Sequence, residues 1–104
     1  MNDFVAERRL RCVGKADGVE RELRIGICRP EEVDGEDVDL PGVGRVVVCR
    51  MVIDGIEEFV RPCVGADTLQ AVHLASDIDA LVKRLSRRYD FYFPDGEPYF
   101  DESL

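Results

Sequence analysis

The sequence contains a single histidine, His73, and none of its four cysteines forms a Cys-x-x-Cys pair. A structural zinc site usually needs such closely spaced ligands. Each of the cysteines lies in a different segment of the chain: Cys12, Cys28, Cys49 and Cys63. We therefore expect free thiols that serve as small buried apolar residues, and the sequence predicts no metal and no cofactor.

Long apolar segments are also absent. The N-terminal residues MNDFVAERRL lack the apolar region of a secretory signal, and no apolar run reaches the 18 residues of a membrane span. The sequence therefore predicts a cytoplasmic protein without a membrane partner. The even number of cysteines permits disulfides, but a reducing compartment makes free thiols the simpler interpretation.

The signatures of common catalytic sites are missing as well. The sequence has no Gly-x-Gly-x-x-Gly, Walker, Gly-x-Ser-x-Gly or His-Glu-x-x-His motif. The glycine pair in residues 42–45 leads into a strand pattern rather than a helix, which argues against a phosphate loop. Asp77 and Asp79 would point about 200° apart on a helix and cannot form a carboxylate dyad. We expect no catalytic residue and favour a protein that is not an enzyme.

Acidic residues outnumber basic ones by 22 to 14, which gives the 104-residue chain a net charge of −8. Two segments, 31–39 and 95–102, carry ten of the acids and no base. This distribution argues against nucleic-acid binding, because phosphates require a basic surface. The segment 31–39 lacks EF-hand spacing, so a solvated loop is the simplest interpretation; Ca²⁺ binding or docking of a basic partner are the alternatives.

Two stretches, 4–13 and 19–28, alternate apolar and polar residues and are joined by a glycine-flanked turn. This pattern predicts an antiparallel hairpin. The stretches 45–53 and 56–64 flank Asp54-Gly55, which is typical of a two-residue hairpin turn. Such a turn would place Ile53 opposite Ile56.

Residues 67–89 have apolar residues at helical spacing. Asp67 is a suitable N-cap, and Gln70 three residues later gives a pattern like that of a capping box. The apolar stripe, which includes Ala71 and Leu74, is expected to pack on the sheet.

Together these patterns predict an α+β fold, an antiparallel four-stranded β-meander with one long C-terminal helix packed on one face (β-β-β-β-α). Residues 1–104 are expected to form a single domain. Residues 29–44 are predicted to be a long acidic loop, and residues 90–104 an aromatic and acidic C-terminal tail.

Three stretches of the sequence are typical of one protein family: Val5-Ala6-Glu7-Arg8 in the first strand, Arg24-Ile25-Gly26 in the second, and the run 65–75 (GADTLQAVHLA) at the start of the helix. On these residues the chain resembles a family of small bacterial single-domain proteins of unknown function. It implies a β-rich sheet with a helix, and it transfers no catalytic residue.

We expect a protein-interaction or self-associating module, with a homodimer or another protein as partner. One helix covers one face of the sheet, and the two-residue turn would place a mixed apolar and charged set on the other face. This candidate interface consists of Val46, Val48, Arg50, Val52, Phe59 and Arg61. Either a second copy or the aromatic tail could cover it.

The alternative is a small-ligand-binding protein or a small enzyme. Its cleft would lie near the start of the helix and the first strand, with Arg8, Gln70 and His73 as candidate ligand contacts. His73 is otherwise expected to be a surface histidine on the flank of the helix.

Overall fold

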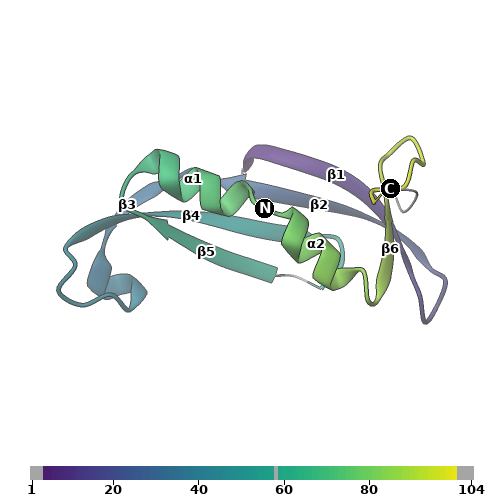
Figure 1. Ribbon diagram of the computed structural model, residues 1–104, viewed down its shortest axis with the longest axis horizontal. Coiled ribbons are helices and arrows are strands. Elements are labelled where there is room, and N and C mark those ends of the chain that lie inside the picture. Colours follow the sequence, from purple (N-terminus) through teal and green to yellow (C-terminus); the bar gives the residue numbers. More distant parts are fainter. Residues whose placement is uncertain (1–3, 58, 101–104) are drawn as a thin grey trace.

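The computed structural model describes residues 4–57 and 59–100, in which an antiparallel sheet carries two short helices on one face (Figure 1). The elements, in chain order, are β1 (Phe4–Gly14), β2 (Glu20–Cys28), β3 (Glu31–Asp34), the 3₁₀ helix η1 (Gly35–Val38), β4 (Arg45–Asp54), β5 (Phe59–Gly65), α1 (Thr68–Ser76), α2 (Asp79–Leu85) and β6 (Tyr89–Tyr92). The α+β class and the antiparallel sheet are confirmed, but within the described residues the sheet has six strands instead of the predicted four.

The predicted first hairpin is present. Strands β1 and β2 pair antiparallel from Ala6 opposite Ile27 to Val13 opposite Glu20. The register shifts between Phe4 and Ala6, so Phe4 does not share the face of the core residues that follow it, contrary to the alternation in the sequence.

The predicted acidic loop 29–44 is wrong in its first half, because residues 31–34 form β3 and residues 35–38 form η1. Strand β4 pairs with β2 up to Met51 opposite Ile27, and then with β3 from Val48 opposite Glu31. Between these two pairs the separation is three residues along β4, from Met51 to Val48, but four residues along the facing chain, from Ile27 to Glu31. The second and third strands therefore line one edge of β4 in succession, with a bulge where they meet.

The hairpin of β4 and β5 is present, but its turn is wider than predicted. Ile53 lies opposite Phe59, and not opposite Ile56, so β5 is shifted by three residues from the predicted register. The shift of three residues is odd, and an odd shift moves every side chain of the second strand to the other face. Pro62, which has no backbone amide to donate, lies on an edge strand, because among the described residues β5 pairs only with β4.

The predicted helix ends at residue 85 and bends at residues 77 and 78, so it consists of α1 and α2. The predicted cap is confirmed: the Asp67 side chain accepts a hydrogen bond from the Gln70 amide at 2.8 Å, and the Gln70 side chain accepts one from the Ala66 amide at 2.6 Å. The bend gives each segment its own buried residues. Leu74, which the helical spacing places in the core, is partly exposed.

The predicted C-terminal tail begins with β6, which pairs with residues 11–14 of β1. Phe91 is buried in the core, and the chain after it reverses so that Tyr99 donates its backbone amide to Phe91. Residues 101–104 of the predicted tail lie outside the described residues. The described part of the tail therefore completes the edge of the sheet beside β1 (Figure 1).

The two faces of the sheet differ in what covers them. We call the side that packs on α1 and α2 the helix face and the other side the open face. The helix face holds the core, to which β4 contributes every second residue and the helices contribute small and branched side chains. The β4 residues of this core are Val47, Cys49, Met51 and Ile53. No helix in the described part of the chain is long and apolar enough to cross a membrane.

Candidate functional site

The residues of the predicted interface lie on two different faces. Val46, Val48, Arg50 and Val52 alternate with the core residues of β4 and therefore share the open face, as predicted. Phe59 and Arg61 pair with Ile53 and Met51, which places them on the helix face. Their predicted place beside the valines is wrong because the turn before β5 is three residues wider than a two-residue turn.

Arg61 holds the junction between the two helices. Its Nη2 atom donates a hydrogen bond at 3.3 Å to the backbone carbonyl of Asp77, which follows the last residue of α1. A positive side chain at the C-terminal end of a helix satisfies a carbonyl that has no partner within the helix. This contact gives Arg61 a structural role in the bend.

The open face is partly covered by the chain's own side chains. The ring of Phe4 occupies the space that a Cβ atom on Gly26 would fill. The guanidinium of Arg24 lies 5.0 Å from the centre of that ring, and its Nε atom donates to Glu7 at 2.6 Å. Because Gly26 is opposite Val52, this stack lies on the strand next to Val52, which is buried.

An ion pair crosses the next part of the open face. Arg50 reaches Glu31 at 3.4 Å, and Glu31 is the residue directly opposite Val48. The stem of Arg50 therefore extends toward Val48, which is fully buried although no helix covers it. The β4 valines of the predicted interface are already withdrawn from solvent in the single chain.

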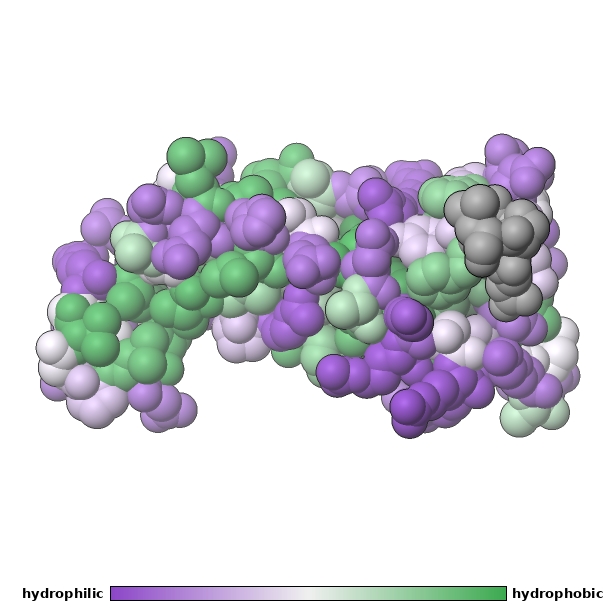
Figure 2. Space-filling view, viewed as in Figure 1, coloured by the Kyte–Doolittle hydropathy of each residue, from purple (hydrophilic) through white to green (hydrophobic). Residues whose placement is uncertain are grey.

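Exposed apolar surface remains along β5 and near η1. Val60, which pairs with Val52, is 49% exposed on the open face, and Val64 on the same face is half-buried. Val43, two residues before β4, is 60% exposed, and Leu40 is also exposed. Figure 2, which views the molecule from the side of the helices, shows hydrophobic surface around the η1 end. We call Val60, Pro62 and Val64 the β5 stripe.

The three residues of the predicted ligand cleft do not come together. Gln70 is engaged in the cap at the start of α1, and His73 is exposed on the same helix. Arg8 instead contacts the tail and the start of α2. The structure therefore offers no convergent polar site at the predicted place.

Arg8 forms a cluster with Tyr99 and Asp79 that the sequence analysis did not identify. Its Nη1 atom donates to the Tyr99 hydroxyl at 2.6 Å and lies 3.6 Å from Asp79, while Tyr99 donates to Asp79. The three residues come from β1, the tail and α2, so no spacing within the sequence could have linked them. The cluster fastens the tail to the body of the protein.

Burial, and then the hydrogen bond to Asp79, raises the pKa of Tyr99. A raised pKa means that the folded state holds the proton more tightly, so stability is complete below the unfolded pKa of about 10 and falls as the pH rises through the folded value. We expect the melting temperature to fall more steeply above pH 10 in the wild type than in Tyr99→Phe. Thermal unfolding from pH 8 to pH 11 measures this, and parallel curves would contradict it.

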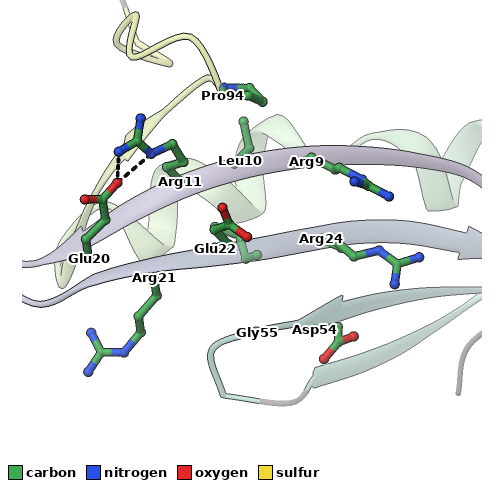
Figure 3. Close-up of a pocket in the computed structure, with 11 residues that line it drawn as sticks. Arg9, Leu10, Arg11, Glu20, Arg21, Glu22, Arg24, Asp54, Gly55 and Pro94 are labelled. Carbon is green, nitrogen blue, oxygen red and sulfur yellow. Dashed lines mark hydrogen bonds and ion pairs between the residues drawn. The ribbon is translucent and has the colours of Figure 1, made fainter.

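A groove of about 700 Å³ lies over β1 and β2 and reaches the tip of the β4–β5 hairpin (Figure 3). Four arginines and three acids contribute to its lining: Arg9, Arg11, Arg21, Arg24, Glu20, Glu22 and Asp54. Figure 3 shows Arg11 joined to Glu20, while Arg9 and Arg24 extend from neighbouring strands.

The arginines of the groove already have acidic partners. Arg9 and Arg24 lie directly opposite each other, an arrangement that is unfavourable for like charges. Glu7 contacts both of them, and the hydrogen bond from Arg24 holds the pKa of Glu7 below its usual range. Arg21 pairs with Asp17 at 2.8 Å. The groove is therefore a balanced ionic surface and not a basic site for an anion.

Metal ligands do not gather in the structure. Within residues 4–57 and 59–100 no group of three or more histidine, cysteine or acidic side chains could hold a metal ion. Comparisons of the chain with protein-family models, with curated proteins and with solved structures found no match, so the resemblance to small bacterial proteins stays a prediction.

Proposed function

We propose that this chain is a self-associating interaction module whose contact is the β5 stripe. The observation that carries the proposal is Val60, a large apolar side chain left half exposed on an edge strand of the open face. Apolar edge strands favour association with another chain unless they are covered. The described part of the tail packs beside β1 and leaves the stripe uncovered.

A second copy is the partner that suits this surface best. A two-fold dimer brings the same patch of each chain together. The β5 stripe carries no charge, so its pairing with itself opposes no like charges, although the chain as a whole carries −8. Salt screens the remaining repulsion between copies, and we therefore expect the dimer to strengthen as ionic strength rises.

We expect the dimer contact to consist of packed side chains and not of backbone hydrogen bonds between the β5 strands of the two copies. Pro62 stands in the middle of β5 and has no backbone N–H to donate. A strand added along this edge would therefore lose a hydrogen bond at its centre. Packing of the β5 stripe of one copy against that of the other avoids this loss.

Light scattering of Val60→Glu tests the proposal. We expect the wild type at twice the chain mass of 11.7 kDa at high concentration, and the variant at a single chain mass with an unchanged circular dichroism spectrum. Val60 is already half exposed within one chain, so the substitution should change stability by no more than about 1 kcal/mol.

Phe59→Glu is the matched control. Phe59 is the neighbouring residue of β5, is 42% exposed, and lies on the helix face instead of the open face. It is expected to leave the dimer intact. A single-chain mass for the wild type, or equal loss of the dimer in both variants, would reject the β5 stripe as the contact.

A further inference from the structure

Three of the four cysteines lie on neighbouring strands. Cys49 of β4 is directly opposite Cys63 of β5. On its other side, the Sγ atom of Cys49 donates to the backbone carbonyl of Cys28 at 3.3 Å. Cys12 lies apart from them on β1, where it pairs with Arg21 and Phe91. All four are free thiols in the structure.

We propose that Cys49 and Cys63 are a redox-modification site, in which hydrogen peroxide converts the two thiols to a cross-strand disulfide. This inference is independent of the proposed self-association. It rests on the register, because directly opposite residues in an antiparallel pair have Cα atoms about 4.5–5.5 Å apart. Disulfides span Cα separations of about 4.4–6.8 Å, so the backbone already lies in the required range.

The helix that packs on this part of the sheet presents small buried side chains to it. Cys49 and Cys63 lie on the helix face, where Ala71 and Ala75 are the buried residues of α1. In the reduced protein the two thiols turn away from each other, one toward Cys28 and the other toward its own strand, at 3.9 Å from the carbonyl of Arg61. Rotation of the side chains, without movement of the strands, brings the sulfurs together.

The reaction starts at Cys63. It is 8% exposed on an edge strand, whereas Cys49 is fully buried and burial raises the pKa of its thiol. The Cys63 thiolate attacks one peroxide oxygen, the O–O bond breaks, and the leaving hydroxide takes a proton to form water. This step leaves a sulfenic acid on Cys63.

The second step closes the disulfide. The sulfur of Cys49 attacks the sulfur of Cys63, the S–O bond breaks, and the departing hydroxide combines with the Cys49 proton as a second water. Overall the peroxide accepts two electrons and two thiols become one disulfide. A dithiol reductant reverses the change.

Peptide mapping distinguishes every pairing of the four cysteines. Trypsin cleaves after lysine and arginine except before proline, so each cysteine falls in its own peptide: residues 12–15, 25–45, 46–50 and 51–83. The native protein is treated with hydrogen peroxide, free thiols are alkylated, and the digest is analysed by mass spectrometry. We expect a crosslinked pair of the peptides 46–50 and 51–83, with a loss of about 2 Da relative to the two free peptides.

The peptide 12–15 is the internal control and should remain alkylated. The crosslink should be lost when the oxidation is repeated in denaturant or with Cys63→Ser, and the oxidised wild type should melt several degrees higher than the reduced protein. Crosslinking of peptide 25–45 to 46–50, a bond between two chains, or four alkylated thiols after oxidation would overturn the proposal. Cys28→Ser should leave the crosslink unchanged, because the hydrogen bond from Cys49 goes to the backbone carbonyl of Cys28, which the substitution keeps.

Discussion

Replacing Gly55 with alanine is expected to lower the free energy of unfolding by about 3–5 kcal/mol. Gly55 has a φ of 112°, a conformation that side-chain-bearing residues rarely adopt. A Cβ atom there would also lie 2.2 Å from the backbone oxygen of Glu22 and 2.9 Å from the Cα atom of Leu23. The hairpin tip packs directly on the backbone of β2, so neither partner can move without opening the sheet.

Gly18→Ala separates the cost of the positive φ from the cost of the collision with β2. Gly18 has a φ of 67°, but no atom lies within 4 Å of the position its Cβ atom would take. This variant retains the conformational penalty and lacks the collision, and we expect a loss of only about 1 kcal/mol. Urea unfolding of both variants measures the difference. Similar losses would show that contact between the hairpin tip and β2 contributes little.

The same contact explains why the turn was mispredicted. Asp54-Gly55 is typical of a two-residue turn in which both positions have a positive φ, but of these two residues only Gly55 has one in the structure. That pattern describes only the local backbone. The tip of the hairpin instead lies against Glu22 and Leu23, residues about 30 positions away, and β5 resumes pairing with Phe59 opposite Ile53.

The strands with regular alternation were predicted well. The ranges of β1, β2 and β4 agree with the structure to within one residue at each end, because one side of each of these strands packs in the core. The face of β5 was wrong because Phe59 and Val60 are both large and apolar. When the register set by the turn is unknown, the alternation of apolar and polar residues does not show which of these two neighbours faces the core.

The strands that the sequence analysis missed depend on distant partners. Three of the four residues of β3 are acidic, a composition that favours a loop, yet they pair with the part of β4 that extends beyond β2. Strand β6 begins at Tyr89, which also fits the helical spacing of the preceding residues. The prediction therefore assigned Tyr89 to the helix and the rest of β6 to the tail. Pairing with β1 decides their conformation.

The candidate sites also depend on contacts between distant parts of the chain, which the sequence does not show. The sequence correctly placed four residues of β4 on one face, but it could not show that Phe4 and Arg50 cover two of them. Exposed apolar residues within an acidic segment, Leu40 and Val43, were a signal that could have directed attention to the η1 end. The opposition of Cys49 and Cys63 requires the observed register, since the predicted register placed Cys49 opposite Val60.

Gly65→Ala is expected to cost about 3 kcal/mol, because the helix face accepts α1 only where β5 has no side chain. Gly65 is the last residue of β5, and a Cβ atom on it would lie 2.6 Å from the backbone nitrogen of Ala71 and 3.0 Å from the carbonyl carbon of Gln70. Both neighbours are backbone atoms of the first turns of α1. A methyl group would therefore push the start of α1 away from the sheet and expose Ala71 and Ala75.

Gly26→Ala provides the comparison that tests this explanation. Gly26 also lies in a strand without a positive φ, and its Cβ atom would collide at 2.2 Å, but with the ring of Phe4. A side chain can rotate away where a helix backbone cannot, so we expect a loss of about 1 kcal/mol or less. Hydrogen exchange adds a local test: the amides of α1 should exchange faster in Gly65→Ala, while α2 changes less. Equal destabilisation by the two variants would mean that close packing of α1 on Gly65 is not what fixes the helix to the sheet.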